Sequence, residues 1–296
     1  MNVLVTGAAG RLGSCVCRLL GEAGVEFLAV DKVSGDQAEY PVKVVDLLDW
    51  ETCDELLEGI DVLAHFANHT KWDSKKPQEV FNENTSMNMN LFQAAANAGC
   101  RRIVFSSSIQ VFSGQLPTDD RDAHEIVLPY IPIDSDMPVF ARNSYALSKQ
   151  TAENMLKYFS VTRGMTCIAI RYPLLLDSKL LIKAKEQEGI ERGKCYDGFA
   201  YLPIGSAAEA AVRAMTAELD GYRQYFVASK DNLEQRSARE VIEEQLSDLH
   251  RNKPIEEMDS LVDCSKVESE LGWKQPNSLE ESFAKYARYK EVLPYE

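Results

Sequence analysis

Short apolar runs alternate with longer amphipathic stretches along the first two thirds of the chain. The runs are rich in β-branched residues and are bounded by turn residues, which is typical of strands buried on both faces. They predict strands near residues 3–5, 27–30, 42–45, 62–66, 103–105 and 167–170. Apolar positions at helical spacing predict helices between them, notably over 11–22, 77–98 and 143–160. This alternation indicates βαβ units and a parallel sheet.

The final third of the chain is less regular. Strands are expected over 201–204 and 224–227, with one helix opening at Ser206 and another over 238–249. Ser206 and Glu209 have the spacing of a capping box, which is a signature of a helix N-terminus.

The charge balance excludes several classes of partner. The 296 residues carry 32 Lys and Arg against 46 Asp and Glu, a net charge of −14. Such an acidic surface repels phosphate backbones and anionic lipid, so neither nucleic acid nor a membrane is expected as a partner. No apolar run approaches the ~18 residues of a membrane span. Because the first strand begins at residue 3, no signal peptide is expected, and a cytoplasmic location is predicted.

The seven cysteines are scattered and contain no C-x-x-C pair, so we expect small buried hydrophobic residues rather than redox or metal sites. His65 and His69 are four residues apart, but on a strand and its exit, and no metal site is expected. His65 is interpreted as a packed strand residue. For His69 a solvated loop position is expected, with a place facing a pocket as the alternative.

Three glycines follow the first strand directly and open the first helix: Gly7, Gly10 and Gly13. In this context glycines permit a tight turn and let backbone N–H groups approach a pyrophosphate, although a turn without any ligand is the alternative. Asp31 ends the second strand, where a carboxylate accepts hydrogen bonds from an adenosine ribose. It would repel a 2′-phosphate, which favours NAD over NADP, while the basic neighbours Arg11 and Lys32 weaken that preference.

These features predict the α/β class, as a Rossmann-type doubly wound parallel sheet with a small C-terminal substrate lobe. Residues 1–172 are expected to form the NAD-binding domain, with a returning strand and helix near 201–228. Residues 173–200 and 229–296 are expected to form the lobe.

Residues at two further places have two possible roles each. Asp46 and Leu47 close the third strand and either flank the adenine or form a turn. Asn84 lies on the inward stripe of the helix over 77–98, where a buried amide needs partners. Its role is either structural or catalytic.

Candidate chemistry lies at the carboxyl end of the fifth strand and on the following long helix. Ser106, Ser107 and Ser108 end that strand, while Tyr145 and Lys149 share a helix face at i, i+4. A neighbouring ammonium lowers the pKa of a phenol, which would give an acid and base usable near neutral pH. Taken alone, the pair is more readily interpreted as a packed tyrosine beside a surface lysine.

In this order, the glycine turn, Asp31, the serines and the Tyr145/Lys149 pair resemble the extended branch of the short-chain dehydrogenase/reductase family, the NAD-dependent epimerase/dehydratase group. Stretches that resemble this branch are 61–67, 84–95, 104–112, 133–149, 263–266 and 271–273. The resemblance implies hydride exchange between NAD and a carbinol carbon. Tyr145 would take the hydroxyl proton, Lys149 would lower the pKa of Tyr145 and hold the nicotinamide ribose, and Ser108 would bind the reacting oxygen.

The turn and the resemblance together predict the residues around NAD. They are Gly7, Ala9, Gly10, Arg11, Leu12, Gly13, Asp31, Asp46, Leu47, Phe66, Ala67, Asn68, Asn84, Ser106, Tyr145, Lys149, Tyr172 and Pro173. The residues predicted to contact substrate are Ser108, Ile109, Gln110, Arg171 and Arg192.

Departures from the family pattern reduce the number of reactions and substrates to be considered. The dehydratases have Thr-Asp-Glu where this chain has Ser108-Ile109-Gln110, which argues against dehydration. The family's Tyr-Gly after the serines is Phe112-Ser113 here. The segment over 174–200 is short and basic with few aromatic residues, which favours a small polyhydroxylated or anionic substrate such as a sugar acid. Arg171 or Arg192 is expected to hold its charged end.

The expected function is therefore an NAD-dependent oxidoreductase acting on a sugar, sugar acid or similar polyol. The alternatives are a nucleotide-sugar epimerase that retains its NAD, and an NAD-binding regulator without turnover. The intact serine, tyrosine and lysine argue against the regulator. Family members often dimerise through the helices that here begin near 77 and 143, and a homodimer is expected. Phe81, Met89 and Phe92 lie off the inward stripe and are expected to offer apolar surface to a second copy.

Overall fold

The centre of the molecule is a seven-stranded sheet in which every pair of neighbouring strands is parallel. This computed structural model describes residues 1–35, 39–70, 76–113, 128–186 and 197–286. The strands, in sheet order, are β3 (Val42–Val44), β2 (Phe27–Asp31), β1 (Val3–Thr6), β4 (Val62–His65), β5 (Arg102–Ser108), β6 (Thr166–Tyr172) and β9 (Tyr222–Phe226). The order turns back between β1 and β4, so the predicted doubly wound parallel sheet is confirmed.

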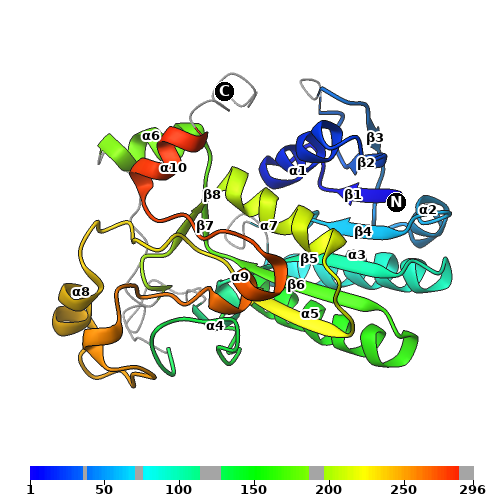
Figure 1. Cartoon of the computed structure of the whole chain (residues 1–296). Coiled ribbons are helices and arrows are strands. Elements are labelled where there is room, and N and C mark those ends of the chain that lie inside the picture. The colour runs from blue at the N-terminus through cyan, green and yellow to red at the C-terminus, as the bar shows by residue number, and fades with distance from the viewer. Residues whose placement is uncertain (36–38, 71–75, 114–127, 187–196, 287–296) are drawn as a thin grey trace.

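Helices cover both faces of this sheet (Figure 1). One face carries α1 (Arg11–Glu22) and α7 (Ile204–Thr216), which also pack against each other. The other carries α2 (Trp50–Leu56), α3 (Pro77–Asn97) and α5 (Ser144–Arg163). Alternate strand residues supply the two cores, because side chains along a strand point to opposite faces. Val3 and Val5 enter the core under α1 and α7, while Leu4 enters the core under α3 and α5.

The smaller elements gather beyond the carboxyl edge of the sheet and at one end of it (Figure 1). A second, two-stranded parallel sheet pairs β7 (Leu174–Leu176) with β8 (Tyr201–Pro203). The remaining elements are α4 (Gln110–Ser113), α6 (Ser178–Glu186), α8 (Ala238–Gln245), the 3₁₀ turn η2 (Ile255–Glu257), α9 (Ser265–Leu271) and α10 (Leu279–Tyr286). The expected division of the chain into a cofactor domain and a substrate lobe stays a prediction.

Two expectations about single side chains are wrong. Helix α7 begins at Ile204, so Ser206 lies inside it and is not its N-cap. A capping box does form at the start of α8, between Ser237 and Glu240. Phe92 is fully buried and packs edge-on against Phe105, with ring centroids 5.8 Å apart. Because α3 contacts both the sheet and α5, it buries a wider face than a single stripe.

The described part of the chain also tests what the sequence indicated about membrane spans, cysteines and metal sites. None of its helices has both the length and the apolar character needed to cross a membrane. Its cysteines are free and buried, as expected for small hydrophobic residues, and Cys195 lies outside the described residues. Its His, Cys, Asp and Glu side chains form no group of three or more that could hold a metal ion.

Candidate active site

A cavity of about 790 Å³ runs along the carboxyl edge of the sheet. This is the edge at which ligands bind in open α/β sheets. The predicted site residues that line it are Gly7, Gly10, Arg11, Leu12, Gly13, Asp31, Asp46, Leu47, Phe66, Ala67, Asn68, Ser106, Ser108, Ile109, Gln110, Tyr145, Tyr172 and Pro173. Residues at the carboxyl ends of six strands, β1 to β6, and at the starts of α1, α4 and α5 are thus brought to one surface.

The glycine turn forms one end of the cavity. Gly7 has φ of +69°, and a Cβ there would lie 2.7 Å from the amide nitrogen of Ala67. A Cβ on Gly13 would lie 2.1 Å from the carbonyl oxygen of Gly7. Helix α1 follows with Gly10 at its N-cap and without a side-chain cap. The N–H groups of its first turn and its positive end are therefore available to a pyrophosphate.

Asp31 stands beside this turn at the end of β2. Its Oδ2 accepts a hydrogen bond from the Ala9 amide at 3.0 Å, so Ala9 orients the carboxylate although it does not itself line the cavity. The two basic neighbours both have acidic partners. Lys32 Nζ lies 3.9 Å from Asp46 Oδ2, and Arg11 Nη1 lies 3.4 Å from Asp177 Oδ2. Both ion pairs are exposed to solvent and therefore weak, so Arg11 and Lys32 can still attract a 2′-phosphate. The glycine turn and the Asp31 carboxylate together fit NAD.

Tyr145 and Ser108 meet at the other end of the cavity, and Lys149 is buried beside Tyr145 without lining the cavity itself. Burial raises the pKa of Tyr145 to about 12, and its hydrogen bond with Ser108 acts in the opposite direction. Lys149 Nζ lies 5.6 Å from the centroid of the Tyr145 ring. Burial lowers the pKa of Lys149 to about 7. Desolvation is thus the largest cause of the pKa shift of both groups. The sequence had instead predicted that the ammonium of Lys149 would set the pKa of the Tyr145 phenol.

Asn84 is buried behind the residues that line the cavity and does not line it itself. Its Oδ1 accepts from the amide of His69 at 2.8 Å, and its Nδ2 donates to the His69 carbonyl at 3.1 Å. The same Nδ2 donates to Ser148 Oγ at 3.0 Å, and Ser148 Oγ donates to the Tyr145 carbonyl at 2.7 Å. Asn84 thereby ties the loop after β4 to the helix that carries Tyr145. The structural role left open by the sequence is the one its contacts support.

His69 and Glu83 are cavity residues that were not among the predicted site residues. His69 Nε2 and Glu83 Oε2 form a short contact at 2.5 Å, and each side chain is 28% exposed. His69 faces the pocket, so its expected place in a solvated loop is wrong. The sequence feature that could have identified His69 as a cavity residue is its position just past the carboxyl end of a strand. Glu83 carries no such signal, because only the packing of α3 brings it there.

Arg171 does not reach the cavity, and its expected role in holding a substrate carboxylate is wrong. Its guanidinium is buried and pairs with Glu153 on α5, Nη2 to Oε2 at 2.8 Å. Its Nη1 donates to the carbonyl of Met137 at 2.9 Å. Glu153 also accepts from Ser107 Oγ at 2.7 Å. Arg192, the other expected anchor, lies outside the described residues.

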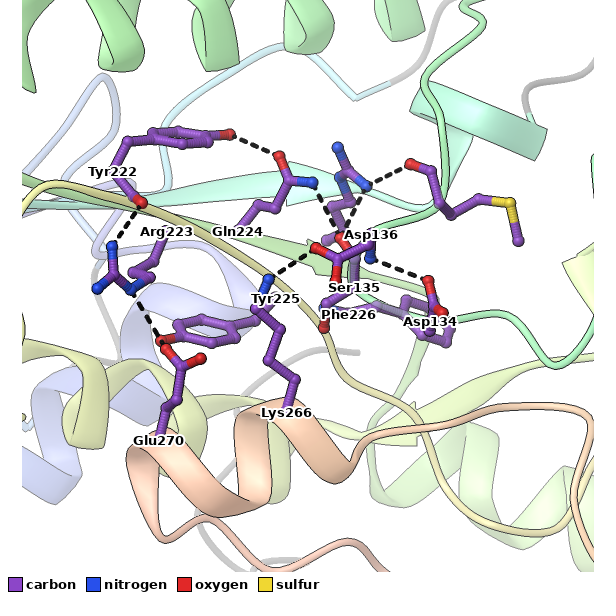
Figure 2. Close-up of polar contacts among 12 residues, drawn as sticks. Asp134, Ser135, Asp136, Tyr222, Arg223, Gln224, Tyr225, Phe226, Lys266 and Glu270 are labelled. Atoms are coloured by element: carbon purple, nitrogen blue, oxygen red, sulfur yellow. Dashed lines mark hydrogen bonds and ion pairs between the residues drawn. The ribbon is translucent and has the colours of Figure 1, made fainter. Parts of the chain in front are cut away.

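The segment around Ser135, which precedes α5, is held against the edge strand β9 and α9 (Figure 2). Gln224 Nε2 donates to the Ser135 carbonyl, and the Phe226 amide donates to Ser135 Oγ, both at 3.0 Å. Lys266 on α9 pairs with Asp136 at 2.7 Å. Residues of the final third of the chain thus hold in place the segment that leads into α5, the helix that carries Tyr145.

Gln110 carries an amide where a dehydratase would carry a carboxylic acid. Its Oε1 accepts from Asn143 Nδ2 at 3.0 Å, and its own backbone amide donates to Ser108 Oγ at 3.2 Å. Asn143 also caps α5 by accepting from the Ala146 amide at 2.7 Å. An amide held in this way supplies no proton for the loss of water, so the contacts agree with the departure seen in the sequence.

Comparisons with known proteins agree with this geometry. A UDP-glucose 4-epimerase of Azospirillum brasilense is 28% identical over 180 residues, which cover 58% of this chain and 48% of that protein. A uronate dehydrogenase of Pseudomonas syringae pv. tomato is 27% identical over 177 residues, covering 57% and 58%. The chain spans about half the length of the curated relatives it matches.

A solved structure with the same fold carries the cofactor that the site fits. It is a short-chain dehydrogenase/reductase superfamily protein of Agrobacterium tumefaciens with bound NAD, with a TM-score of 0.73 at 16% identity, covering 98% of this chain and 97% of that one. The model of the NAD dependent epimerase/dehydratase family matches residues 3–176, which hold the glycine turn, Asp31, Ser108, Tyr145 and Lys149. This chain is a member of the NAD-dependent epimerase/dehydratase family, and its cofactor is NAD.

Proposed function

We propose that the protein is an NAD-dependent oxidoreductase that moves a hydride between NAD and a hydroxyl or carbonyl group of a sugar, sugar acid or similar polyol. The observation that carries this proposal is a continuous cavity that joins the glycine turn and Asp31 at one end to Ser108 and Tyr145 at the other. NAD, when bound, supplies the acceptor or donor of the hydride.

The chain's own groups handle the substrate oxygen and its proton. Ser108 Oγ hydrogen-bonds the reacting oxygen and fixes it near the phenol of Tyr145. In the oxidative direction the O–H bond of the carbinol breaks and its proton passes to the Tyr145 oxygen, while the C–H bond gives up a hydride and the C=O bond forms. Lys149, as an ammonium, stabilises the phenolate that accepts this proton.

The chemistry of the cavity favours a substrate rich in hydroxyl groups. Ser108, Gln110, Thr70 and the His69–Glu83 pair present hydrogen-bonding groups there. The uronate dehydrogenase relative supports a sugar acid. Since Arg171 is paired inside the core, a substrate carboxylate would need another partner.

The second candidate is an epimerase that keeps its NAD, and the UDP-glucose 4-epimerase relative favours it. The two reactions differ in what leaves the protein. A dehydrogenase releases NADH in proportion to substrate, whereas an epimerase returns the hydride and accumulates none.

The deciding experiment incubates the purified protein with NAD and a panel of free sugars, sugar acids and UDP-sugars. NADH absorbance and proton NMR of the products are recorded together. We expect NADH with a free sugar or sugar acid and no binding of UDP in calorimetric titration. Epimerised product without NADH, with NAD retained by the protein, would establish the epimerase. NAD binding without turnover of any compound would point to a regulator.

We also infer that the protein forms a homodimer through α3 and α5, which pack side by side. The exposed apolar side chains on these two helices are Met89, Leu147, Tyr158 and Val161. Leu147, Tyr158 and Val161 recur at spacings that place them on one face of α5.

A further inference from the structure

Lys149 stands at the end of a buried chain of hydrogen bonds that begins on the first strand. Its Nζ donates to Asn68 Oδ1 at 2.9 Å and to the Ser106 carbonyl at 2.7 Å. Asn68 follows β4 and lines the cavity. It is therefore a side chain at the active site that contacts the catalytic lysine directly.

The chain continues away from the cavity through three fully buried side chains. Asn68 Nδ2 donates to Asn88 Oδ1 at 3.0 Å. His65 Nε2 lies 2.8 Å from the same oxygen, and His65 Nδ1 lies 2.6 Å from Thr6 Oγ1. Strands β1 and β4, helix α3 and helix α5 are thus joined at their polar positions.

The charge on Lys149 determines the direction of every bond in this chain. An ammonium only donates, so Asn68 must turn its oxygen toward Lys149 and its amide hydrogens toward Asn88. Asn88 must then present its oxygen to two donors, which places the proton of His65 on Nε2 and makes Nδ1 the acceptor for the Thr6 hydroxyl. Burial lowers the pKa of His65 to about 3, so the ring is neutral, as this pattern requires.

In this orientation Asn88 leaves one buried donor without a partner, which supports the order of bonds given above. Its Nδ2 is buried and has no hydrogen-bond partner among the described residues. Rotating the amide would place its hydrogens against those of Asn68 Nδ2, so the bond between Asn68 and Asn88 would be lost even if His65 changed tautomer to accept from Asn88. Buried donors without a partner are rare in folded proteins, and here the network that leads to Lys149 accounts for one.

We propose that Asn68 is a positioning residue for Lys149, held in its orientation by Asn88 and His65, and that it keeps the ammonium group in place beside Tyr145. The inference rests on the proposed function, since it concerns the same site. Asn68 acts through the lysine: its oxygen offsets part of the desolvation of the ammonium, which alone would favour the neutral amine.

Few other groups around Lys149 can stabilise its ammonium, so the carbonyl of Asn68 contributes a separate part of that stabilisation. The titratable groups that face it are Tyr145 on its own helix and the neutral His65 on β4. Strand β5 contributes the Ser106 carbonyl and the ring of Phe105, whose centroid lies 4.6 Å from Nζ. Glu153, one turn further along α5, is engaged by Arg171 and Ser107. An uncharged carbonyl from Asn68 therefore stabilises the ammonium without neutralising its effect on the phenol.

The test follows the lysine itself and does not depend on turnover. Protein labelled at the lysine ε-carbons is titrated by NMR, and the Lys149 signal is identified by its loss in Lys149→Arg. Removing an acceptor disfavours the charged form, so Asn68→Ala is expected to move the titration midpoint of Lys149 to lower pH by about one unit. An unchanged midpoint in a folded variant would overturn the proposal.

A second variant separates positioning from contact with the cofactor. Asn88 does not line the cavity, yet Asn88→Ala is expected to move the midpoint in the same direction by a smaller amount. The double variant should shift no further than Asn68→Ala, because both changes act on one bond. Additive shifts would show that Asn88 acts by another route. The matched control is Asn90→Ala, on the same helix, whose amide donates to the carbonyls of Leu47 and Leu48.

Kinetics with an active substrate give a further readout. With NAD at saturating concentration, Asn68→Ala should lower kcat about tenfold at alkaline pH and less at acidic pH. A loss confined to the Kd for NAD would assign Asn68 to cofactor binding alone. If no compound is turned over, the proposed function fails, and the NMR titration still decides the role of Asn68. Should Asn88→Ala fail to fold, Asn68→Ala decides alone.

Discussion

The guanidinium of Arg171 and the carboxylate of Glu153 form a bidentate ion pair inside the protein, with Nε to Oε1 at 3.0 Å and Nη2 to Oε2 at 2.8 Å. Their side chains are 1% and 2% exposed. The pair joins β6 to the helix that carries Tyr145 and Lys149, and Ser107 adds a bond from β5. An arginine that looks available for a substrate in the sequence is thus part of the framework of the site.

Breaking this pair should destabilise the fold. Glu153→Ala would leave a buried, unpaired guanidinium, and we expect the free energy of unfolding to fall by ~3–5 kcal/mol. The measurement is urea denaturation at neutral pH. The exposed pair of Lys285 and Glu209 provides the control, because Glu209→Ala should cost less than ~1 kcal/mol. Equal losses in the two variants would contradict this account.

Removing the phenolic hydroxyl should separate binding from chemistry. Tyr145→Phe keeps the ring that packs beside Lys149 but loses the group that accepts the proton. We expect turnover to fall by ~10²–10⁴-fold with little change in the Kd for NAD, measured by steady-state kinetics and calorimetry. Phe112→Leu, a buried aromatic change outside the cavity, is a control for packing. Activity close to that of the unmodified protein would mean that another group transfers the proton.

Lys149 should lower stability at neutral pH, because burial depresses its pKa to about 7 from an ordinary value of 10.5. The unfolded chain binds the proton more tightly, so the cost is full below pH 7 and disappears as pH rises toward 10.5. Lys149→Met is expected to be more stable than the unmodified protein by ~1–3 kcal/mol at pH 6, with the difference narrowing above pH 7. Urea denaturation across this range tests the sign, and a difference that widens with pH would refute it.

Cofactor choice should depend on the carboxylate at the end of β2. Asp31→Ser removes the charge that repels a 2′-phosphate and the acceptors for the ribose hydroxyls. We expect NAD to bind about tenfold more weakly and NADP to bind more tightly than before, measured by calorimetric titration of both nucleotides. Glu22→Ser, at the far end of α1, is the charge-matched control. Tighter binding of NADP than NAD by the unmodified protein would contradict the assignment.

The proposed dimer should be sensitive to charge on the outer face of α5. Val161 is 85% exposed, and Val161→Glu would place a charge in the proposed contact. Light scattering is expected to give the mass of two chains for the unmodified protein and of one chain for this variant. Thr216→Glu, at the exposed end of α7 on the opposite face of the sheet, serves as the control. A monomer mass for the unmodified protein would end this proposal.

The sequence by itself determined the elements and the order of the cofactor site. Short apolar runs locate the strands because a strand of a parallel sheet is buried on both faces, and apolar residues at helical spacing locate the helices because each buries one face. Helix α1 spans the expected residues 11–22. The glycine turn, Asp31 and the serines could be assigned to one edge for a related reason. In a parallel sheet the carboxyl ends of the strands all meet there, so their order along the chain is enough.

Only the tertiary structure decided which side chains are free to meet a ligand. Arg171 and Arg11 have the same chemistry in the sequence, but Glu153 takes up the first inside the core while the second lines the cavity. Glu83 reaches the site through the packing of α3, and Phe92 is buried by the same packing. Residue type sets what a group can do, whereas burial and partners distant in the chain set its charge, its pKa and its access to the cavity.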